Sequence, residues 1–239
     1  MKKAGDYLIS GLAWFFGLIV FFLGAVSMLL VGLFHAGPVF EWLVKLTCRG
    51  ILLATGIRVR VHGRENVEPG RQYILMMNHV NFFDPFVFYH GFPGKARGIE
   101  EESHFRWLLY GWVIRRIGQV PVNRTQPFKA MKSLDQAAAV VRKKHGFSFV
   151  ILPEGTRTRD GKLGMFKKGG FHLALKSGLD IVPIVQVGAF RINRKGSKLI
   201  RPGSINYFIE KPVPLAGYSK ENIEDLMIRV RNIFLQYVE

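Results

Sequence analysis

The stretch Asn78-His79-Val80-Asn81-Phe82-Phe83-Asp84-Pro85 joins an apolar run to the start of a predicted helix. Before it, residues 73–77 form a run that is apolar and short enough to be a buried strand rather than a helix. After it, Asp84-Pro85 is typical of a helix start. Pro at the first helical position loses no hydrogen bond, and a preceding Asp can accept from the free N–H groups of the first turn. His79 is therefore predicted in a strand-to-helix loop, where ligands of α/β sheets usually bind.

This loop allows His79 and Asp84 to meet, whereas residues five apart on a continuous helix point in different directions. A His whose second nitrogen is held by a carboxylate is the usual arrangement of a general base. The carboxylate fixes the tautomer and stabilises the imidazolium ion that forms. The alternative is a loop histidine beside a capping Asp, and the spacing of two residues does not decide between them.

Composition limits the class of protein. With 239 residues, the chain is long enough for one sizeable α/β domain plus an appendage. Its 34 Lys and Arg outnumber its 17 Asp and Glu, and the net charge of +17 favours nucleic acid, anionic lipid or an acidic carrier protein as a partner. The single cysteine, Cys48, excludes an intrachain disulfide, fits a reducing compartment and is predicted to be a packing residue.

Residues 7–34 contain no charged side chain. As a helix this run would be about 42 Å long, which exceeds the hydrocarbon thickness of about 30 Å. A signal peptide is disfavoured because its apolar core would be much shorter. Four glycines can either pack against another helix or mark a bend: Gly11, Gly17, Gly24 and Gly32. A tilted single span and a hairpin dipping into one leaflet are both open.

Residues 39–54 mix apolar side chains with Glu41, Lys45 and Arg49, and they include Trp42. A helix with this composition suits the headgroup layer of a membrane. The alternative is an ordinary helix packed on the domain. The neighbouring apolar run favours the membrane.

The sequence therefore predicts a membrane-anchoring helical segment over residues 1–54 and an α/β domain over residues 55–239. The basic residues at positions 45, 49, 58 and 60 outweigh Lys2 and Lys3. By the positive-inside rule, the main domain lies on the cytoplasmic side of the membrane.

Short apolar runs alternate with helical patterns through the second segment. Strands are predicted at residues 58–61, 73–77, 120–122, 147–152, 181–185 and 205–209. Helices are predicted at residues 85–90, 105–116, 128–144, 171–176 and 219–237, the fourth ending at Gly178. The alternation indicates an α/β fold with a mixed sheet flanked by helices.

Cations stand beside small residues at the ends of the predicted strands: Asn123-Arg124, Glu154-Gly155-Thr156-Arg157, and Lys167-Lys168 before Gly169. Arginine suits phosphate because its planar fork donates two parallel bonds, and a neighbouring Gly lets a ligand approach the backbone. The alternatives are a solvated Arg124 and a surface salt bridge of Arg157 with Glu154 or Asp160. The strand-end positions favour an anion site.

Several common motifs are absent. The sequence has no G-x-S-x-G elbow, no phosphate-binding loop of the G-x-x-x-x-G-K-[ST] type, no H-E-x-x-H, no C-x-x-C and no dinucleotide fingerprint. No metal site is indicated. Nucleic acid is disfavoured because no known reading motif accompanies the basic residues.

Four motifs then stand in order: Asn78-His79 with Asp84-Pro85, Pro121-Val122-Asn123-Arg124, Leu152-Pro153-Glu154-Gly155-Thr156-Arg157, and Val182-Pro183-Ile184-Val185. In this order they resemble the four blocks of the glycerolipid acyltransferase family, over about residues 58–214. The resemblance implies that His79 is the base and Asp84 its partner. It implies substrate binding by Arg124, Glu154, Gly155, Thr156, Arg157, Lys167 and Pro183, the last of these near the acyl chain or donor.

The resemblance also implies a reaction. A fatty acyl group would move from acyl-CoA or acyl carrier protein to the sn-2 hydroxyl of lysophosphatidic acid, giving phosphatidic acid, with no cofactor and on a membrane of preferentially anionic lipids. The family commonly has a Lys where this chain has the acidic run Glu100-Glu101-Glu102. Another lysophospholipid or lipid alcohol is therefore an open alternative, as is a non-enzymatic basic protein that binds membranes.

Overall fold

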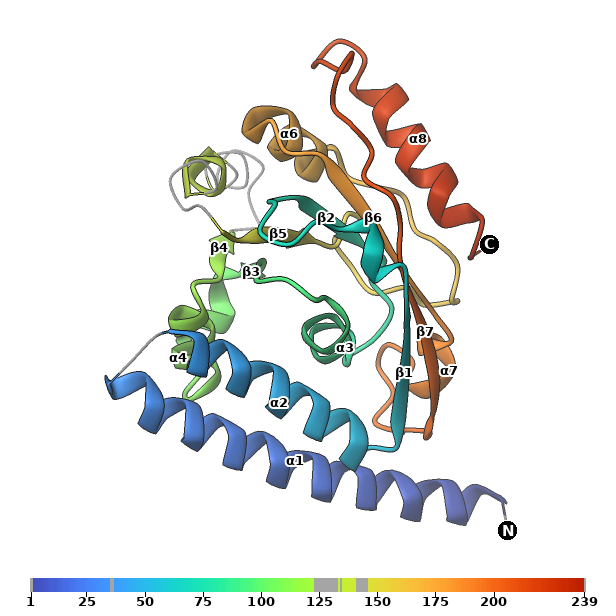
Figure 1. Cartoon of the computed structure of the whole chain (residues 1–239). Helices are drawn as coiled ribbons and strands as arrows, with labels where there is room; N and C mark the ends of the chain where they lie inside the picture. Colours follow the sequence, from blue (N-terminus) through green and yellow to red (C-terminus); the bar gives the residue numbers. More distant parts are fainter. Residues whose placement is uncertain (1, 35–36, 123–132, 134, 141–145, 239) are drawn as a thin grey trace.

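The described residues form one seven-stranded sheet, in the order β1-β7-β6-β2-β5-β3-β4 (Figure 1). The computed structural model describes all residues except 1, 35–36, 123–132, 134, 141–145 and 239. The strands are β1 (Ile57–His62), β2 (Ile74–Met77), β3 (Ala96–Glu101), β4 (Val120–Val122), β5 (Ser148–Ile151), β6 (Ile181–Val187) and β7 (Gly203–Ile209).

Strand direction decides where the functional residues meet. β6, β2, β5, β3 and β4 are parallel to one another, whereas β7 is antiparallel to β6 and parallel to β1. The sheet is therefore mixed, as predicted. The carboxyl ends of β2 and β5 lie side by side, so the loops that carry His79 and Glu154 leave the sheet at the same edge.

Helices cover both faces of the sheet. They are α1 (Lys2–Phe34), α2 (Pro38–Ala54), α3 (Asp84–Gly91), α4 (Tyr110–Ile117), α6 (Lys168–Ser177), α7 (Ala189–Ile192) and α8 (Ile223–Leu235), with the 3₁₀ helices η1 (Arg64–Asn66) and η2 (Glu102–Arg106). Figure 1 shows α1, α2 and α3 on one face and α6 and α8 on the other.

Central strand β2 shows how the sheet is buried on both faces. Its side chains alternate between two apolar clusters. Leu75 and Met77 belong to the cluster with α2 and α3, whereas Ile74 and Met76 belong to the cluster with α6 and α8. A strand buried on both faces is apolar at nearly every position, and for this reason the apolar run at residues 73–77 predicted a strand. The predicted α/β fold with helices flanking a mixed sheet is confirmed.

The structure differs from the expected elements in the middle of the chain. β3 lies in a segment for which the sequence predicts no strand. The predicted helix over residues 105–116 is confirmed only from Tyr110 onward, and its predicted start is wrong, because η2 ends at Arg106 and α4 begins at Tyr110. Of the predicted helix over residues 128–144, residues 133 and 135–140 are helical and the others lie outside the described residues. Helix α6 ends at Gly178, as expected, in the left-handed conformation that glycine adopts readily.

Helices α1 and α2 pack closely through small residues. A Cβ atom added at Gly17 would lie 3.0 Å from the Thr55 side chain, and one added at Gly24 would lie within 3 Å of Thr47. At Gly32 it would meet Trp112 of α4, whereas at Gly11 no atom lies within 4 Å. Three of the four glycines in residues 7–34 therefore serve helix packing.

Helix α2 packs on the domain, as one of the two alternatives predicted, and it also exposes apolar side chains. Its inner face is buried and includes Phe40, Val44 and Cys48, whereas Trp42 and Leu53 are exposed on the outside. Burial raises the pKa of the Cys48 thiol to about 12, which fits the predicted packing role. Since α2 packs on the same core as the sheet, the division of the chain after residue 54 stays a prediction.

Helix α1 contains a segment, Ala4–Leu33, that is long and apolar enough to cross a membrane, with a mean hydropathy of 2.6. In the structure this helix lies along the domain. Near its start, Oδ2 of Asp6 lies 3.5 Å from Nη2 of Arg201, and further along, Trp14 Nε1 donates to the Lys198 carbonyl at 2.6 Å. Near its end, Arg116 Nη2 donates to the Gly32 carbonyl at 2.6 Å. The helix is thus tied to the domain at both ends.

Candidate active site

The centre of the candidate site is the pair His79 and Asp84. The two side chains meet as expected: Nδ1 of His79 lies 2.6 Å from Oδ2 of Asp84. A carboxylate can only accept, so Nδ1 carries the hydrogen, and the lone pair of Nε2 is left for a substrate. The His79 side chain is 19% exposed whereas that of Asp84 is fully buried. The imidazole is therefore reachable from solvent, and the carboxylate beside it is shielded from water.

The Asp84 carboxylate accepts four hydrogen bonds, which come from the His79 ring, the loop backbone and strand β6. Besides His79, its carboxylate accepts the backbone N–H of Val80 at 2.7 Å and that of Asn81 at 3.0 Å. Nε2 of Gln186 donates to its Oδ1 at 2.7 Å. Several donors stabilise the negative charge of a buried carboxylate and fix its orientation.

The predicted capping role of Asp84 is wrong. Asp84 is the first residue of α3, and the position before it, Phe83, makes no side-chain cap hydrogen bond. The carboxylate turns back toward the loop and accepts from residues that precede the helix. Asn81 supports the same turn, since its Oδ1 accepts the Phe83 N–H at 2.8 Å and its Nδ2 donates to the Ala189 carbonyl at 2.7 Å.

The loop is anchored to the neighbouring strand β6 through Asn78 and Gln186. The Asn78 side chain accepts the Gln186 N–H at 2.9 Å and donates to the Gln186 carbonyl at 3.0 Å. Nε2 of Gln186 also donates to the Asn78 carbonyl at 3.1 Å. Gln186 is 1% exposed, so this network is fixed within the core.

Glu154 connects the loop after β5 to His79. Its Oε1 accepts the His79 backbone N–H at 2.7 Å, and its Oε2 accepts the Gly164 N–H at 3.0 Å. The two loops meet again where the Thr158 N–H donates to the His79 carbonyl at 2.9 Å. Burial raises the pKa of the Glu154 carboxyl, and the two backbone hydrogen bonds oppose that rise. Glu154 thus supports the backbone of His79, while its role toward substrate stays a prediction.

Two lysines flank the loop that follows β5. Gly155 has a φ of 68°, and a Cβ added there would lie 3.0 Å from Nζ of Lys167, so the glycine allows this lysine to lie against the backbone. Nζ of Lys195, after α7, donates to Oγ1 of Thr156 at 2.6 Å. The predicted residues Gly155, Thr156 and Lys167 are therefore brought together.

The remaining predicted residues lie as follows. Arg157 forms no ion pair with Glu154 or Asp160, both of which are described residues, so the surface salt bridge considered for it is not formed. Lys168 points elsewhere, to Glu224 of α8 at 2.7 Å. Pro183 is buried inside β6, paired with Met76, and not at the edge of the sheet. Arg124, with Asn123, lies outside the described residues.

A small pocket opens beside His79. Its lining includes Glu154, Thr158, Lys162 and, from the C-terminal segment, Val238. Lys162 brings a further cation to the site. The pocket therefore adjoins both His79 and one basic side chain.

Three residues at this site were not singled out in the sequence: Gln186, Lys195 and Lys162. Gln186 had a faint signal, since it is a polar residue directly after the apolar strand predicted at residues 181–185. Lys195 and Lys162 had none, because they stand in polar loops where a lysine is ordinary.

Comparison with known proteins gives one family. A model of the acyltransferase family matches residues 58–187. The 1-acyl-sn-glycerol-3-phosphate acyltransferase of Borreliella burgdorferi is 31% identical over 180 residues, which are 74% of this chain and 71% of that protein. The enzyme of the same name from Limnanthes douglasii is 29% identical over 181 residues, 76% of this chain. Those residues span only 63% of the Limnanthes protein.

A solved structure has the same fold. The 1-acyl-sn-glycerophosphate acyltransferase PlsC of Thermotoga maritima matches with a TM-score of 0.81, over 99% of this chain and 97% of that chain. The identity is 24%, so this likeness concerns the fold alone. It includes the long N-terminal helix, since almost the whole of both chains is covered.

Proposed function

This chain belongs to the acyltransferase family, and on that basis we propose that it moves a fatty acyl group to the sn-2 hydroxyl of lysophosphatidic acid, giving phosphatidic acid. The observation that carries the proposal is the 2.6 Å contact between His79 and a buried Asp84. The acyl donor is a thioester, either acyl-CoA or acyl carrier protein, and no cofactor is required.

The chemistry follows from the free lone pair of His79 Nε2. This nitrogen removes the proton of the acceptor hydroxyl as the oxygen attacks the thioester carbonyl. Asp84 stabilises the imidazolium ion that forms, as the carboxylate of a catalytic triad does. When the carbon–sulfur bond breaks, the thiolate takes the proton back from Nε2. His79 and Asp84 thus act as base and positioning partner, with no covalent acyl-enzyme.

Basic side chains support binding of the acceptor phosphate. Lys167 and Lys195 flank the loop of Gly155 and Thr156, and Arg157 continues it. Arg157 is suited to a bidentate contact with phosphate, which the lysines supplement as point charges. Arg124, Glu154 and Pro183 complete the set proposed from the family motifs.

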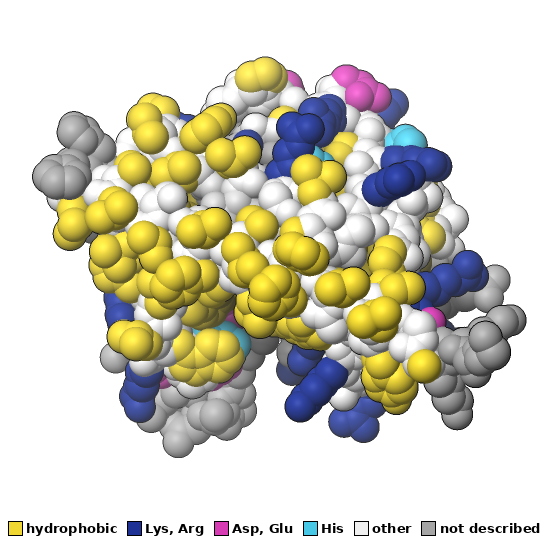
Figure 2. All heavy atoms as spheres, turned by 90° about the horizontal axis from the view of Figure 1, so that it is seen from below, with side chains coloured by type: hydrophobic (Ala, Val, Ile, Leu, Met, Phe, Trp, Pro, Cys, Tyr) yellow, Lys and Arg dark blue, Asp and Glu magenta, His cyan; other side chains and the backbone are white. Residues whose placement is uncertain are grey.

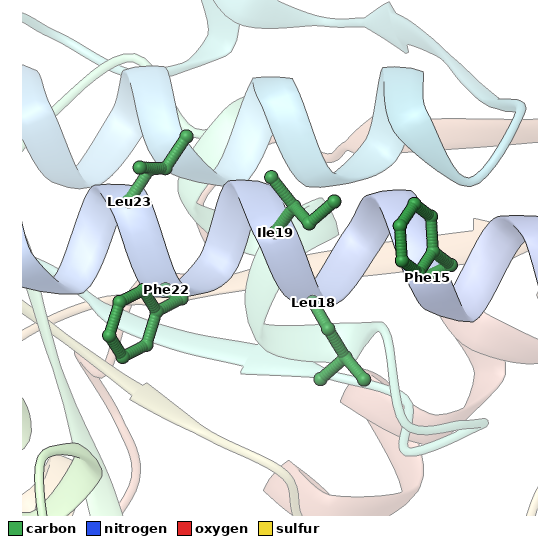
Figure 3. A pocket seen from close by; sticks show the side chains of 5 residues that line it. All are labelled: Phe15, Leu18, Ile19, Phe22 and Leu23. Carbon is green, nitrogen blue, oxygen red and sulfur yellow. The ribbon is translucent and has the colours of Figure 1, made fainter.

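Membrane attachment is proposed through the outer face of α1 and α2. Figure 2 shows this face, on which hydrophobic side chains gather and Lys and Arg stand around them. Figure 3 shows one part, a shallow groove formed by side chains of α1 alone: Phe15, Leu18, Ile19, Phe22 and Leu23. An exposed apolar face that runs along a whole helix and is bordered by basic residues suits the interface of a bilayer with anionic lipids.

The ties at both ends of α1 favour a helix that lies in one leaflet over one that spans the membrane. A spanning helix would have to give up the contacts of Trp14 with Lys198 and of Arg116 with Gly32. The Trp14 ring also lies 5.6 Å from that of Phe82, within the loop between His79 and Asp84. The base therefore stands beside the membrane face, where a lipid acceptor is found. The domain is proposed to face the cytoplasm.

The deciding experiment is an acyltransfer assay with purified protein, lysophosphatidic acid and acyl-CoA or acyl carrier protein. We expect phosphatidic acid from the wild type and a loss of at least about a thousandfold in His79→Ala, because the base is removed. The variant should keep its circular dichroism spectrum and its binding to vesicles. Turnover close to wild type in His79→Ala would overturn the mechanism.

The acidic run before α4 favours testing a second acceptor. Glu100 and Glu101 end β3 at the same edge of the sheet as the candidate site, and Nδ1 of His104 lies 2.6 Å from Oε1 of Glu100. Carboxylates disfavour a phosphate monoester nearby. Other lysophospholipids and lipid alcohols should therefore be assayed in parallel, and product from only one acceptor identifies the substrate.

A further inference from the structure

The break between η2 and α4 contains the only described non-glycine residue with a positive φ. Leu109 has φ 62° and ψ −60°. The N–H of Tyr110 donates to the Leu108 carbonyl at 2.7 Å and closes a three-residue γ-turn of the rare, strained type. Such strain persists only where the surrounding structure imposes it, and it is concentrated at functional positions.

Packing explains how the strained turn is held. The side chain of Leu109 packs against the core cluster that contains α2 and α3, and so does Trp112 one turn into α4. Gly111 lies so close to the preceding segment that an added Cβ would be 2.4 Å from the Phe105 carbonyl oxygen. Leu109 is thus drawn inward, although a glycine would relieve the backbone.

The same turn drives its neighbours outward. Leu108 is 97% exposed, the highest value among the exposed large hydrophobic residues, and Trp107 is 56% exposed. Arg106 before them and Arg115 on α4 are exposed as well. A tip of Trp and Leu between arginines has the composition of a membrane-interface element. In water, an exposed Leu108 side chain contributes no hydrophobic stabilisation to the fold.

Helix α4, which follows the tip, packs against the end of α1. Trp112 lies against Gly32 of α1, and Arg116 of the same helix donates to the Gly32 carbonyl. Leu30 and Leu33, on either side of Gly32, are exposed apolar residues. Figure 1 shows α4 beside the end of α1 and the start of α2.

We propose that Trp107 and Leu108 form a second membrane contact, a tip that the strained turn at Leu109 holds in place for insertion into the lipid layer that α1 occupies. This inference rests on the proposed membrane attachment. α1 supplies the long apolar contact, and the tip adds a point of contact at the far end of the face. Two separated contacts fix the orientation of the domain on the bilayer more firmly than the face of α1 and α2 alone.

The test compares Leu108→Asp with Ile228→Asp, using vesicles of phosphatidylcholine and phosphatidylglycerol. Ile228 is also an exposed apolar residue, but it lies on α8, on the opposite face of the sheet. Leu108→Asp should weaken vesicle binding at least about tenfold, the amount expected for losing one buried leucine side chain, and Ile228→Asp should not weaken it. Leu108→Phe should bind as the wild type does.

A second measurement does not depend on the stability of the variant. Lipids brominated on their acyl chains should quench less tryptophan fluorescence in Trp107→Phe than in the wild type. In detergent micelles, Leu108→Asp should turn over substrate at the wild-type rate. Equal vesicle binding by Leu108→Asp and wild type overturns the tip alone, whereas failure of the wild type to bind vesicles overturns the membrane attachment as well.

Discussion

At the scale of single residues, the site is organised by one buried carboxylate. Asp84 is fully buried and receives hydrogen bonds from His79, Val80, Asn81 and Gln186. Only the bond from His79 concerns the base directly. The others fix the position of the carboxylate so that His79 is held in one tautomer.

Gln186 is the most testable member of this network. Gln186→Leu removes the donor to Asp84 and puts an apolar side chain of similar size in its place. We expect kcat to fall by about tenfold to a hundredfold, the value of one hydrogen bond to a charged group, with KM for both substrates little changed. Gln119→Leu is the matched control, because Gln119 donates to Tyr89 and not to the site. Equal kcat values in the two variants would contradict this role.

Arg157 is expected to act on acceptor binding. Arg157→Ala should raise KM for lysophosphatidic acid by about tenfold or more, because a charge-assisted contact to phosphate is lost, and should leave KM for the acyl donor within about twofold. Steady-state kinetics with each substrate varied in turn measures both constants. Arg159→Ala, an exposed neighbour, serves as the control. A wild-type KM for the acceptor in Arg157→Ala would show that Arg157 does not bind the acceptor phosphate.

At the scale of elements, the loop and helix after β2 are built around the active-site pair. β2 is buried at all four positions and cannot shift without exposing apolar surface. Helix α3 begins at Asp84, so the carboxylate is fixed to the first turn of a packed helix. At the other end of α3, His90 is half-buried, and burial together with Arg49 of α2 and Arg64 of η1 lowers its pKa.

His90 should therefore make the fold sensitive to acid. Its pKa in the folded state lies below the unfolded value of about 6.5, so the unfolded chain binds more protons between the two values. The free energy of unfolding falls as the pH drops below about 6.5, and this contribution is fully present above that value. In His90→Gln the decline should be smaller. Urea unfolding at about pH 7.5 and about pH 5.5 measures it, and an identical decline in both proteins would rule the effect out.

At the scale of the whole molecule, the two faces of the sheet are covered by different layers of helices. One face carries α6 and α8, and the other carries α3 under the layer of α1 and α2, whose outer surface is apolar (Figures 1 and 2). The contact between Trp14 and Phe82 joins this layer to the loop of His79. The fold thus places the base next to the proposed lipid phase.

This arrangement predicts that both ends of α1 lie on the same side of the membrane. Cysteines introduced in separate Gly5→Cys and Gly37→Cys variants have room, because no atom lies within 4 Å of an added Cβ at either glycine. An impermeant maleimide should label both in inverted membrane vesicles and neither in intact cells. Background labelling is low, since the native Cys48 is buried and its pKa is raised to about 12. Ile228→Cys marks the side of the domain, and labelling of the two ends from opposite sides would establish a span.

The sequence by itself determined the elements whose signal is local. Strand β2 is a continuous apolar run, and β5 and β6 are apolar except at Ser148 and Gln186, since most positions of a strand buried on both faces are apolar. The spacing of His79 and Asp84 and the order of the four motifs could also be read directly from the sequence, because spacing and order are properties of the chain and need no tertiary structure. β3 was not, since its sequence Ala-Arg-Gly-Ile-Glu-Glu has no apolar pattern and it becomes a strand only by pairing with β4 and β5.

Only the tertiary structure decided which distant residues serve the site. Gln186 stands 102 residues from Asp84, and Lys195 stands 39 residues from Thr156. The same holds for the break at Leu109, where packing of the side chain into the core overrides a helical pattern that was locally sound. Hydrogen bonds and packing contacts of this kind form between chain segments that the fold brings together. The sequence specifies which residues are present, and the order and direction of the strands decide which of them lie close together.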